Sequence, residues 1–460
     1  MKFTKFGKAL LMSALSAGVV VSVTSCVQSY SVGYLYVTGT ETAQTKGNGI
    51  ISGYKIDHNT GKLTAINGLP VASGGANPER AVLLTGSRFL YVLNRGVTAS
   101  GSANCTTSDP CLYSNITQFA VGGNGILTPQ ETFYTEGINP FRLLADSSGG
   151  FLYVLDHDSP APNSTAAVPI SGTANNPDPG CALGLGGAKT CGDITVFKID
   201  PTTGRLSIVV DAQVTSASGT ALPYFPVPAN PVDFVFAGNT IVTMSGTPST
   251  SFPYIHGTSA FPYTWGAGSG QLTISQNSPQ ALGINEGTHL SYTGGNLYVM
   301  DNEPYPGAPA GTSQILPYTV PASGTLQPQL NGAVAISSSQ SNPVVVLQEA
   351  KKSWLYVADQ GNYTDPTNGA SGIDAFTILS PFQLTEMTGA PWAPYGIGSG
   401  PQCMVEDPSD QFIYTANFND STITGRSIQA TSGILRNLNW SGVVTLPGPA
   451  TWCLVDGRTS

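Results

Sequence analysis

The sequence contains few charged residues. Only 10% of its 460 residues are Asp, Glu, Lys or Arg, and they leave a formal net charge of −9 at pH 7. A nucleic-acid site needs clustered Lys and Arg to neutralise phosphates. With 18 basic residues against 27 acidic ones, the composition argues against a nucleic-acid partner.

Several motifs of catalysis are missing as well. There is no GxSxG, no HExxH and no phosphate-binding loop, and the chain has only four histidines. Neither these histidines nor the cysteines have the spacing of a zinc site. We therefore predict no cofactor and no transition metal, while calcium bound by loop aspartates stays open.

The first 25 residues have the layout of a secretory signal. Lys2, Lys5 and Lys8 precede an uncharged apolar run over 9–23. This run is shorter than the roughly 20 apolar residues of a membrane-spanning helix. Residues 1–25 are therefore predicted to be a signal peptide that directs export.

The end of this leader resembles the lipobox of bacterial lipoproteins. It reads Val23-Thr24-Ser25-Cys26, and the resemblance implies that Cys26 is lipidated and anchors the protein to a membrane. Residues 26–30 would then be a short linker. Val27 stands where an aspartate would resemble an inner-membrane retention signal, which favours the outer membrane of the cell envelope, facing the periplasm or the surface. An ordinary cleaved signal with a chance cysteine is the alternative.

Six further cysteines remain, an even number that suits disulfides in an oxidising compartment. Their spacing suggests the pairs Cys105 with Cys111, Cys181 with Cys191, and Cys403 with Cys453.

A six-residue segment recurs seven times along the chain. FLYVLN at Phe89 and FLYVLD at Phe151 are nearly identical, and each copy is rich in β-branched and aromatic residues, as a buried strand should be. The copies begin at positions 34, 89, 151, 240, 296, 354 and 412. After most copies comes a strand with a Gly-containing turn, such as 51–66, and before most copies comes a strand introduced by Asn-Pro, such as 77–84.

Four strands per unit and seven units predict an all-β, seven-bladed β-propeller over residues 31–460. The segment 452–456 matches an innermost strand but no hexapeptide follows it, and the first hexapeptide lacks an innermost strand. We therefore expect one blade to be built from both ends of the chain, closing the ring without free edges. A Cys403–Cys453 disulfide would staple the two ends, with the two cysteines at matching positions.

These hexapeptides, the ID-x-x-TG-x-L turn of 56–63 and 199–206, and the seven repeats resemble the seven-bladed lactonase family. That family includes 6-phosphogluconolactonase-like and YVTN-repeat proteins. The resemblance implies a candidate lactonase, a carboxylic-ester hydrolase that acts on a small lactone or sugar-derived ligand, and we expect a monomer. An exported protein would rarely meet 6-phosphogluconolactone, a cytoplasmic metabolite.

Aligning the innermost strands on Asn-Pro singles out one position. It holds Arg80, Arg142, Asp233 and His289 in four consecutive blades. If these side chains point inwards, the arginines could bind an anion or stabilise an oxyanion, and His289 could act as a general base oriented by Asp233. A structural salt-bridge network that fills the channel is the alternative.

Residues that follow the hexapeptide strands point to the same face. We predict Arg95, His157, Asp301 and Glu303 as substrate-binding residues. Insertions at 97–115, 158–193, 246–259, 303–314 and 361–372 are also expected on that face. The segments 223–228 and 261–265 are expected to add aromatic surface for sugar rings or apolar ligands.

Two functions thus stay open. One is a lipid-anchored lactonase with its site at the channel mouth. The other is a non-catalytic propeller that binds a glycan, a peptide or a partner protein through its long loops, because fold does not give function.

Overall fold

The computed structural model of the chain is built of strands alone; its described part contains no helix. No described segment forms a helix of the length and apolar character that a membrane crossing would require. The described residues are 30–41, 48–84, 86, 88–102, 105, 109–160, 191–215, 220–248, 255–274, 280–284, 287–302, 313–329, 333–336, 342–351, 353–361, 371–379, 383–387 and 395–457.

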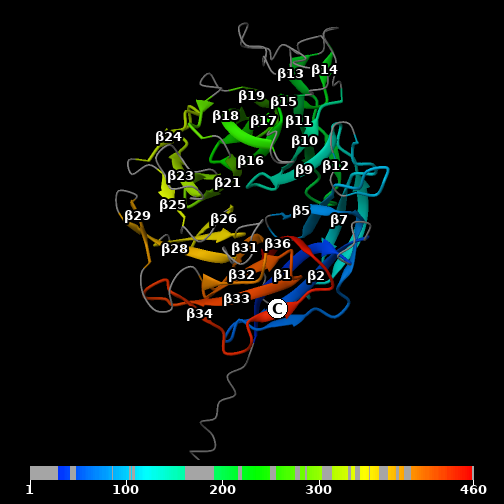
Figure 1. Cartoon of the computed structure of the whole chain (residues 1–460). Coiled ribbons are helices and arrows are strands. Elements are labelled where there is room, and N and C mark those ends of the chain that lie inside the picture. The colour runs from blue at the N-terminus through cyan, green and yellow to red at the C-terminus, as the bar shows by residue number, and fades with distance from the viewer. Residues whose placement is uncertain are drawn as a thin grey trace, which may run out of the picture.

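The strands form seven blades arranged in a ring (Figure 1). Blade 1 consists of β36 (Ala450–Asp456), β1 (Ser31–Thr40), β2 (Asn48–Asp57), β3 (Leu63–Ala65) and β4 (Val71–Ala76). Blade 2 consists of β5 (Pro78–Leu83), β6 (Phe89–Asn94), β7 (Asn115–Val121) and β8 (Leu127–Phe133). Blade 3 consists of β9 (Ile138–Ala145), β10 (Phe151–Asp158), β11 (Cys191–Ile199), β12 (Leu206–Ile208) and β15 (Phe225–Ala229), with a hairpin of β13 (Asp211–Thr215) and β14 (Ala221–Leu222).

The other four blades repeat the plan. Blade 4 consists of β16 (Pro231–Ala237), β17 (Thr240–Pro248), β18 (Ile255–Trp265), β19 (Leu272–Ile274) and β20 (Gln280–Ala281). Blade 5 consists of β21 (Gly287–Thr293), β22 (Asn296–Asp301), β23 (Gln314–Thr319), β24 (Gln327–Pro328) and β25 (Val334–Ala335). Blade 6 consists of β26 (Pro343–Gln348), β27 (Trp354–Asp359), β28 (Gly372–Leu379), β29 (Gln383–Glu386) and β30 (Tyr395–Gly396). Blade 7 consists of β31 (Pro401–Glu406), β32 (Phe412–Asn417), β33 (Thr422–Ile428), β34 (Leu435–Asn437) and β35 (Val443–Thr445).

The predicted propeller is therefore confirmed. Every hexapeptide is the second strand of a blade, and every segment aligned on Asn-Pro is an inner strand. The inner strands neighbour one another around the centre of the ring, and outer strands such as β24, β29 and β34 lie at its periphery (Figure 1). In most blades the fourth strand is broken into two short pieces that pair with the third strand, so these sheets count five strands. The predicted insertions lie between second and third strands, as expected. The bounds of 246–259 are wrong, because its described residues belong to β17 and β18.

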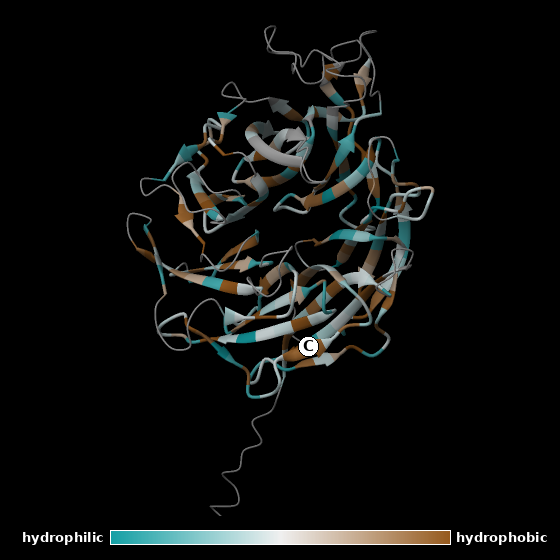
Figure 2. Ribbon diagram, in the orientation of Figure 1, coloured by the Kyte–Doolittle hydropathy of each residue, from teal (hydrophilic) through white to brown (hydrophobic). Residues whose placement is uncertain are grey.

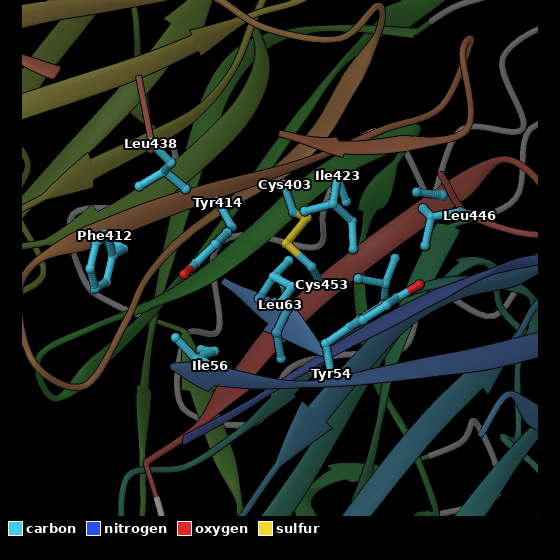
Figure 3. Packing of buried hydrophobic residues seen from close by; sticks show 14 of the residues in the cluster. Tyr54, Ile56, Leu63, Cys403, Phe412, Tyr414, Ile423, Leu438, Leu446 and Cys453 are labelled. Atoms are coloured by element: carbon cyan, nitrogen blue, oxygen red, sulfur yellow. A yellow bond between two sulfur atoms is a disulfide. The ribbon is translucent and has the colours of Figure 1, made fainter. Parts of the chain in front are cut away.

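Both ends of the chain build blade 1, which confirms the predicted closure. Strand β1 pairs antiparallel with β36 on one side and with β2 on the other. The Cys403–Cys453 disulfide links β31 of blade 7 to β36 of blade 1, with its Cα atoms 5.8 Å apart, a normal separation for this bond. Figure 3 shows it inside a cluster of buried side chains from both blades, among them Tyr54, Ile56 and Tyr414. The ring is thus closed by hydrogen bonds, a covalent bond and apolar packing together.

Hydrophobic residues recur along the strands of the ring, between neutral and hydrophilic ones (Figure 2). Seven clusters of buried residues each join two adjacent blades, so the core is a ring of seven interfaces. One expectation is wrong here: the aromatic segments 223–228 and 261–265 do not form a binding surface. Phe225, Val227 and Tyr263 are buried in the interface between blades 3 and 4, because their strands pack face to face.

A tyrosine at the third hexapeptide position explains much of the repeat. Its hydroxyl donates to the carbonyl of a glycine in the turn between the third and fourth strands of the next blade. These pairs are Tyr36 with Gly125, Tyr91 with Gly204, Tyr153 with Gly270, Tyr356 with Gly433 and Tyr414 with Gly61. The glycines have φ between 61° and 82°, a region that side chains rarely adopt. The tyrosine of each of these hexapeptides is therefore hydrogen-bonded to the glycine-containing turn of the next blade.

Every inner strand carries a β-bulge near its start. The pairing with the second strand skips one residue, for example between Pro78 and Arg80 and between Pro231 and Asp233. The asparagine before the proline takes a positive φ in four blades, at Asn77, Asn139, Asn230 and Asn342. Bulges re-aim the side chains that follow them. The Asn-Pro signal thus marks the point at which each inner strand turns a side chain toward its neighbours around the ring.

Candidate functional site

The residues that follow these bulges form one level around the ring. They are Arg80, Arg142, Asp233, His289, Val345, Cys403 and Trp452. The prediction that four consecutive blades place Arg, Arg, Asp and His at one level is confirmed. The predicted equivalence of Cys453 with Cys403 is wrong by one residue, because Trp452 pairs with the fifth hexapeptide position and Cys453 with the fourth. Blade 1 has no Asn-Pro to fix the alignment.

Arg142 and Asp233 form the tightest ion pair of this level. Arg142 Nε donates to Asp233 Oδ1 at 2.8 Å, and their side chains are 13% and 8% exposed. Asp233 also accepts the backbone N–H groups of Phe234 and Leu290, each at 2.9 Å. Its carboxylate is therefore hydrogen-bonded to Arg142 and to the inner strand of blade 5. The structure gives it no hydrogen bond to His289, so the expected orienting role of Asp233 toward this histidine is not seen.

Glu79, the residue before Arg80, also contacts the arginines. Its Oε1 lies 3.5 Å from Arg142 Nη1 and 3.8 Å from Arg80 Nη1. Glu79 is the bulged residue of blade 2, and this irregularity brings its carboxylate beside the arginines. We name Glu79, Arg80, Arg142, Asp233 and His289 the central cluster.

Arg80 is supported by stacking. Its guanidinium lies 4.2 Å from the ring centroid of Trp452, a cation–π contact. Burial and the charge of Arg142 lower the pKa of Arg80 to about 9, while Glu79 and Asp233 oppose this. Arg80 therefore stays charged at neutral pH. Trp452 was not identified from the sequence, and the register that places it depends on the closure of the ring.

His289 is neutral in this surrounding. Burial first, and then the charges of Arg142 and Arg80, lower its pKa to about 3 against the opposing effect of Asp233. The residue keeps part of its surface exposed, whereas Nδ1 is buried and has no hydrogen-bond partner. Burial and the neighbouring guanidiniums thus both disfavour a proton on the His289 ring.

Arg95 lies next to the central cluster, as predicted. It follows β6, and its backbone N–H donates to the carbonyl of Asn77 at 2.9 Å. Burial lowers the pKa of Arg95, and the charges of Glu79, Arg142 and Asp158 also act on it. Its Nε is buried without a hydrogen-bond partner. None of the ion pairs in the described residues includes Arg95.

His157 lies beside Arg95's acidic neighbour. Its Nδ1 is 3.1 Å from Asp158 Oδ1, and Asp158 Oδ2 accepts a hydrogen bond from Asn139 Nδ2 at 2.7 Å. His157 therefore borders the cluster. The predicted binding residue Asp301 does not join it. Asp301 is 1% exposed and accepts from Gln314 Nε2 at 2.7 Å, so it belongs to the polar contacts between second and third strands.

Some predicted residues fall outside the described part of the chain, namely Glu303, Cys26 and Cys181. The Cys105–Cys111 disulfide is present, with Cα atoms 5.2 Å apart. In the described ranges, no group of three or more His, Cys, Asp or Glu residues is arranged to hold a metal ion.

A cavity of about 310 Å³ lies on blade 7, away from the central cluster. Arg426, Asn437 and Asp420 are among its lining residues, and no predicted site residue lines it. We place the candidate site at the central cluster, because catalysis needs polar groups with shifted pKa values that converge.

Comparison with known proteins agrees with the fold. A family model described as lactonase, 7-bladed beta-propeller, matches residues 34–173. The resemblance to the seven-bladed lactonases is confirmed. A protein from Bacteroides uniformis, provisionally assigned as a 6-phosphogluconolactonase, superposes on this lactonase-like propeller with a TM-score of 0.62 and 11% identity, covering 92% of this chain and 99% of that one.

Two further solved structures are similar. A second such provisional 6-phosphogluconolactonase, from Bacteroides fragilis, has a TM-score of 0.61 and 14% identity over 92% of this chain and 98% of that one. The periplasmic gluconolactonase of Pseudomonas aeruginosa has a TM-score of 0.59 and 13% identity over 93% and 99%. At these identities the likeness establishes the fold. None of the curated proteins compared with the sequence matches it.

Proposed function

We propose that this lactonase-like propeller hydrolyses a lactone at the central cluster. The observation that carries the proposal is the neutral, unpartnered Nδ1 of His289 beside Arg80 and Arg142. A neutral imidazole can accept a proton, and guanidiniums stabilise an oxyanion. Most buried polar atoms have a hydrogen-bond partner, so an unpartnered imidazole nitrogen between two guanidiniums supports a chemical role for this cluster.

The reaction follows from these groups. A water molecule attacks the lactone carbonyl carbon and gives its proton to the neutral imidazole of His289. The carbonyl oxygen becomes negative and is stabilised by Arg80 and Arg142. When the ring C–O bond breaks, the imidazolium returns the proton to the leaving alkoxide, and a hydroxy acid forms. Asp233 serves as a positioning residue, because it holds the Arg142 side chain in place.

Arg95 anchors an anionic or strongly polar group of the substrate. Its buried guanidinium makes none of the ion pairs in the described residues, and an unpaired buried charge is costly until an anion binds it. Binding of an anion there, or beside Arg80, would also weaken the repulsion that keeps His289 unprotonated. Substrate binding would thus raise the basicity of the group that accepts the proton.

The site of action is proposed to be the cell envelope. The leader and Cys26 motivate this, and two disulfides suit an oxidising compartment. The similar structure from Pseudomonas aeruginosa is called periplasmic. We therefore infer a lipid-anchored protein whose propeller faces the periplasm or the surface.

The test is hydrolysis of a panel of sugar and aliphatic lactones by the purified full-length chain. His289→Gln should reduce kcat/KM by at least 100-fold, in line with the loss of a general base. His58→Gln is the matched control, because His58 also has a buried, unpartnered Nδ1 but stacks on Tyr30 in blade 1. Turnover that survives His289→Gln contradicts the proposed base. No turnover of any lactone by the wild type contradicts catalysis and favours a propeller that binds glycans or partner proteins.

A further inference from the structure

Exposed apolar side chains gather next to the central cluster. Ten large apolar residues are exposed in the described part of the chain, and four of them lie between positions 112 and 138. They are Leu112 at 39%, Tyr113 at 84%, Tyr134 at 64% and Ile138 at 38%. We call these four residues the apolar rim. Exposed apolar groups that occur together mark binding surfaces more often than scattered ones do.

Backbone pairing and hydrogen bonds bring the four residues together. Cys111 N–H donates to Asn139 Oδ1 at 2.7 Å, which places Leu112 near the start of β9. Ile138 is the first residue of that strand. Phe133 pairs with Ile116 across β7 and β8, so Tyr134 leaves the sheet on the side where Tyr113 enters it. The rim therefore spans the connection from blade 2 to blade 3 on the face where the inner strands begin.

The segment that carries the rim is held firmly. The Cys105–Cys111 disulfide closes it, and Leu112 N–H donates to the carbonyl of Val97 at 2.8 Å. Tyr113 has φ of 62°, a region that a bulky aromatic residue adopts only when its surroundings impose it. Such backbone strain persists where the rest of the structure over-determines it and concentrates at ligand sites. The exposed Tyr113 ring is thus presented by a fixed backbone.

Sequence neighbours of the rim residues contact Arg95 and its acidic neighbour Asp158. Ser114 Oγ donates to the carbonyl of Arg95 at 2.6 Å. Asn139, which holds Cys111, donates through Nδ2 to Asp158, and the charge of Asp158 acts on Arg95. A ligand whose polar end meets Arg95 would therefore have its other end within the reach of the rim.

We propose that the apolar rim binds an alkyl or aryl substituent of the lactone, so that the substrate class is amphipathic lactones. This proposal rests on the proposed function of the central cluster. A sugar lactone carries hydroxyls on every side, and hydroxyls pressed against Leu112 and Ile138 would lose hydrogen bonds to water without replacement. An alkyl chain loses nothing there. Each methylene that becomes fully buried should raise kcat/KM by about fourfold.

The test is a chain-length series with the full-length protein. kcat/KM is measured for γ-butyrolactone, γ-octalactone and γ-decalactone with the wild type, with the double variant Tyr113→Asn and Ile138→Ser, and with Val443→Ser. Asn tolerates the left-handed φ of position 113, so the loop should keep its shape. Val443 is 46% exposed on β35 of blade 7 and is the matched control.

We expect kcat/KM of the wild type to rise at least tenfold from γ-butyrolactone to γ-decalactone. The double variant should lose most of this rise while its kcat/KM for γ-butyrolactone stays within about threefold of the wild type, as one expects of an interaction with a remote part of the substrate. Val443→Ser should match the wild type. The same slope in the double variant, or preference of the wild type for glucono-δ-lactone over γ-decalactone, overturns the proposal.

A binding measurement separates failure of the rim from failure of catalysis. Titration calorimetry compares octanoate with acetate as ligands of the wild type and the double variant. Tighter binding of octanoate that the double variant loses supports the rim even if no lactone is hydrolysed. Equal affinity for the two carboxylates contradicts the rim, whether or not lactones are hydrolysed.

Discussion

The two halves of the ring of inner strands place different kinds of side chain at the same structural position, the residue that follows each bulge. Blades 2 to 5 place Arg80, Arg142, Asp233 and His289 after their bulges, whereas blades 6, 7 and 1 place Val345, Cys403 and Trp452 there. Both halves use the same backbone irregularity. In the first half, ion pairs join the side chains, and one buried imidazole nitrogen has no partner. In the second half, Cys403 is bonded to Cys453, the residue after Trp452, within apolar packing.

We call blades 2 to 5 the charged half and blades 6, 7 and 1 the apolar half. The two halves differ in how much they contribute to stability and to the proposed reaction. Closing the ring is done by the apolar half, where Cys403 and Cys453 are 1% and 3% exposed. Apolar residues in the charged half would stabilise the fold about as well as the ion pairs do, because the attraction within a buried ion pair roughly balances the cost of its desolvation. Three charged side chains and a neutral imidazole at that position in four consecutive blades are therefore consistent with the proposed chemical use.

The largest expected effect on stability is in the charged half. Asp233→Ala leaves Arg142 buried without its partner and should lower the free energy of unfolding by about 3–5 kcal/mol. Urea denaturation measures this. Glu131→Ala is the control, because the Arg205–Glu131 pair is exposed on both sides and should contribute only about 0–1 kcal/mol. Equal, small losses in the two variants would mean that Asp233 does not hold the cluster together.

The apolar half is broken by removing its disulfide. Replacing Cys403 and Cys453 by Ser opens a link with a sequence separation of 50 and should lower the free energy of unfolding by about 4 kcal/mol. Replacing Cys105 and Cys111, with a separation of 6, should lower it by about 2 kcal/mol. Lactone hydrolysis should survive the first change at temperatures where the protein stays folded. If hydrolysis disappears from the folded protein, the two halves are not separate in function.

A smaller effect is expected from the tyrosine hydroxyls that join the blades. Tyr414→Phe removes a 2.7 Å hydrogen bond to Gly61 across the closure and should cost about 1 kcal/mol of unfolding free energy. Tyr153→Phe removes a 3.4 Å bond to Gly270 and should cost less. Denaturation of the two variants under the same conditions checks the order, and the reverse order would show that the closure depends less on this contact than other interfaces do.

The smallest change is expected in the pH dependence of catalysis. Because the pKa of His289 is lowered to about 3, its neutral form is present throughout pH 5 to 8. kcat/KM should therefore show no break near 6.5, the ordinary value for histidine. Neutral His289 contributes to stability above pH 6.5, and this contribution decreases as the pH falls towards 3, because the unfolded chain then binds a proton that the folded protein does not. A break in kcat/KM near 6.5 that His289→Gln abolishes would contradict the depressed pKa.

The sequence was sufficient for the architecture because the repeat is carried by side chains with one structural task. The hexapeptide tyrosine and the turn glycine contact each other across blades, so both recur and both are visible. The same regularity located Arg80, Arg142, Asp233 and His289. The alignment of the inner strands was wrong by one residue in blade 1, which has no Asn-Pro, and Trp452 was therefore not identified.

Other features of the site depend on three-dimensional contacts that no spacing encodes. The proton affinity of His289 follows from burial and from arginines on two other blades. Glu79 enters the cluster only because a bulge turns it there. Asp301 looked available at the end of a strand, yet it is buried against Gln314. The segments 223–228 and 261–265 were predicted to be exposed, but they lie in an interface between blades. Aromatic residues and prolines occur in both environments, so composition alone does not distinguish them.

The central claim is that the charged half carries the reaction and the apolar half does not. It is tested most directly by measuring kcat/KM for one hydrolysed lactone in two variants, each changed at the residue that follows the bulge of an inner strand. Arg80→Gln changes the charged half, and Val345→Ala changes the apolar half. We predict a loss of about 100-fold or more for Arg80→Gln, as for removal of an oxyanion donor, and less than about threefold for Val345→Ala, which affects packing alone. Similar losses in both variants would contradict the account, because the charged half would then be no more than another way of filling the centre of the ring.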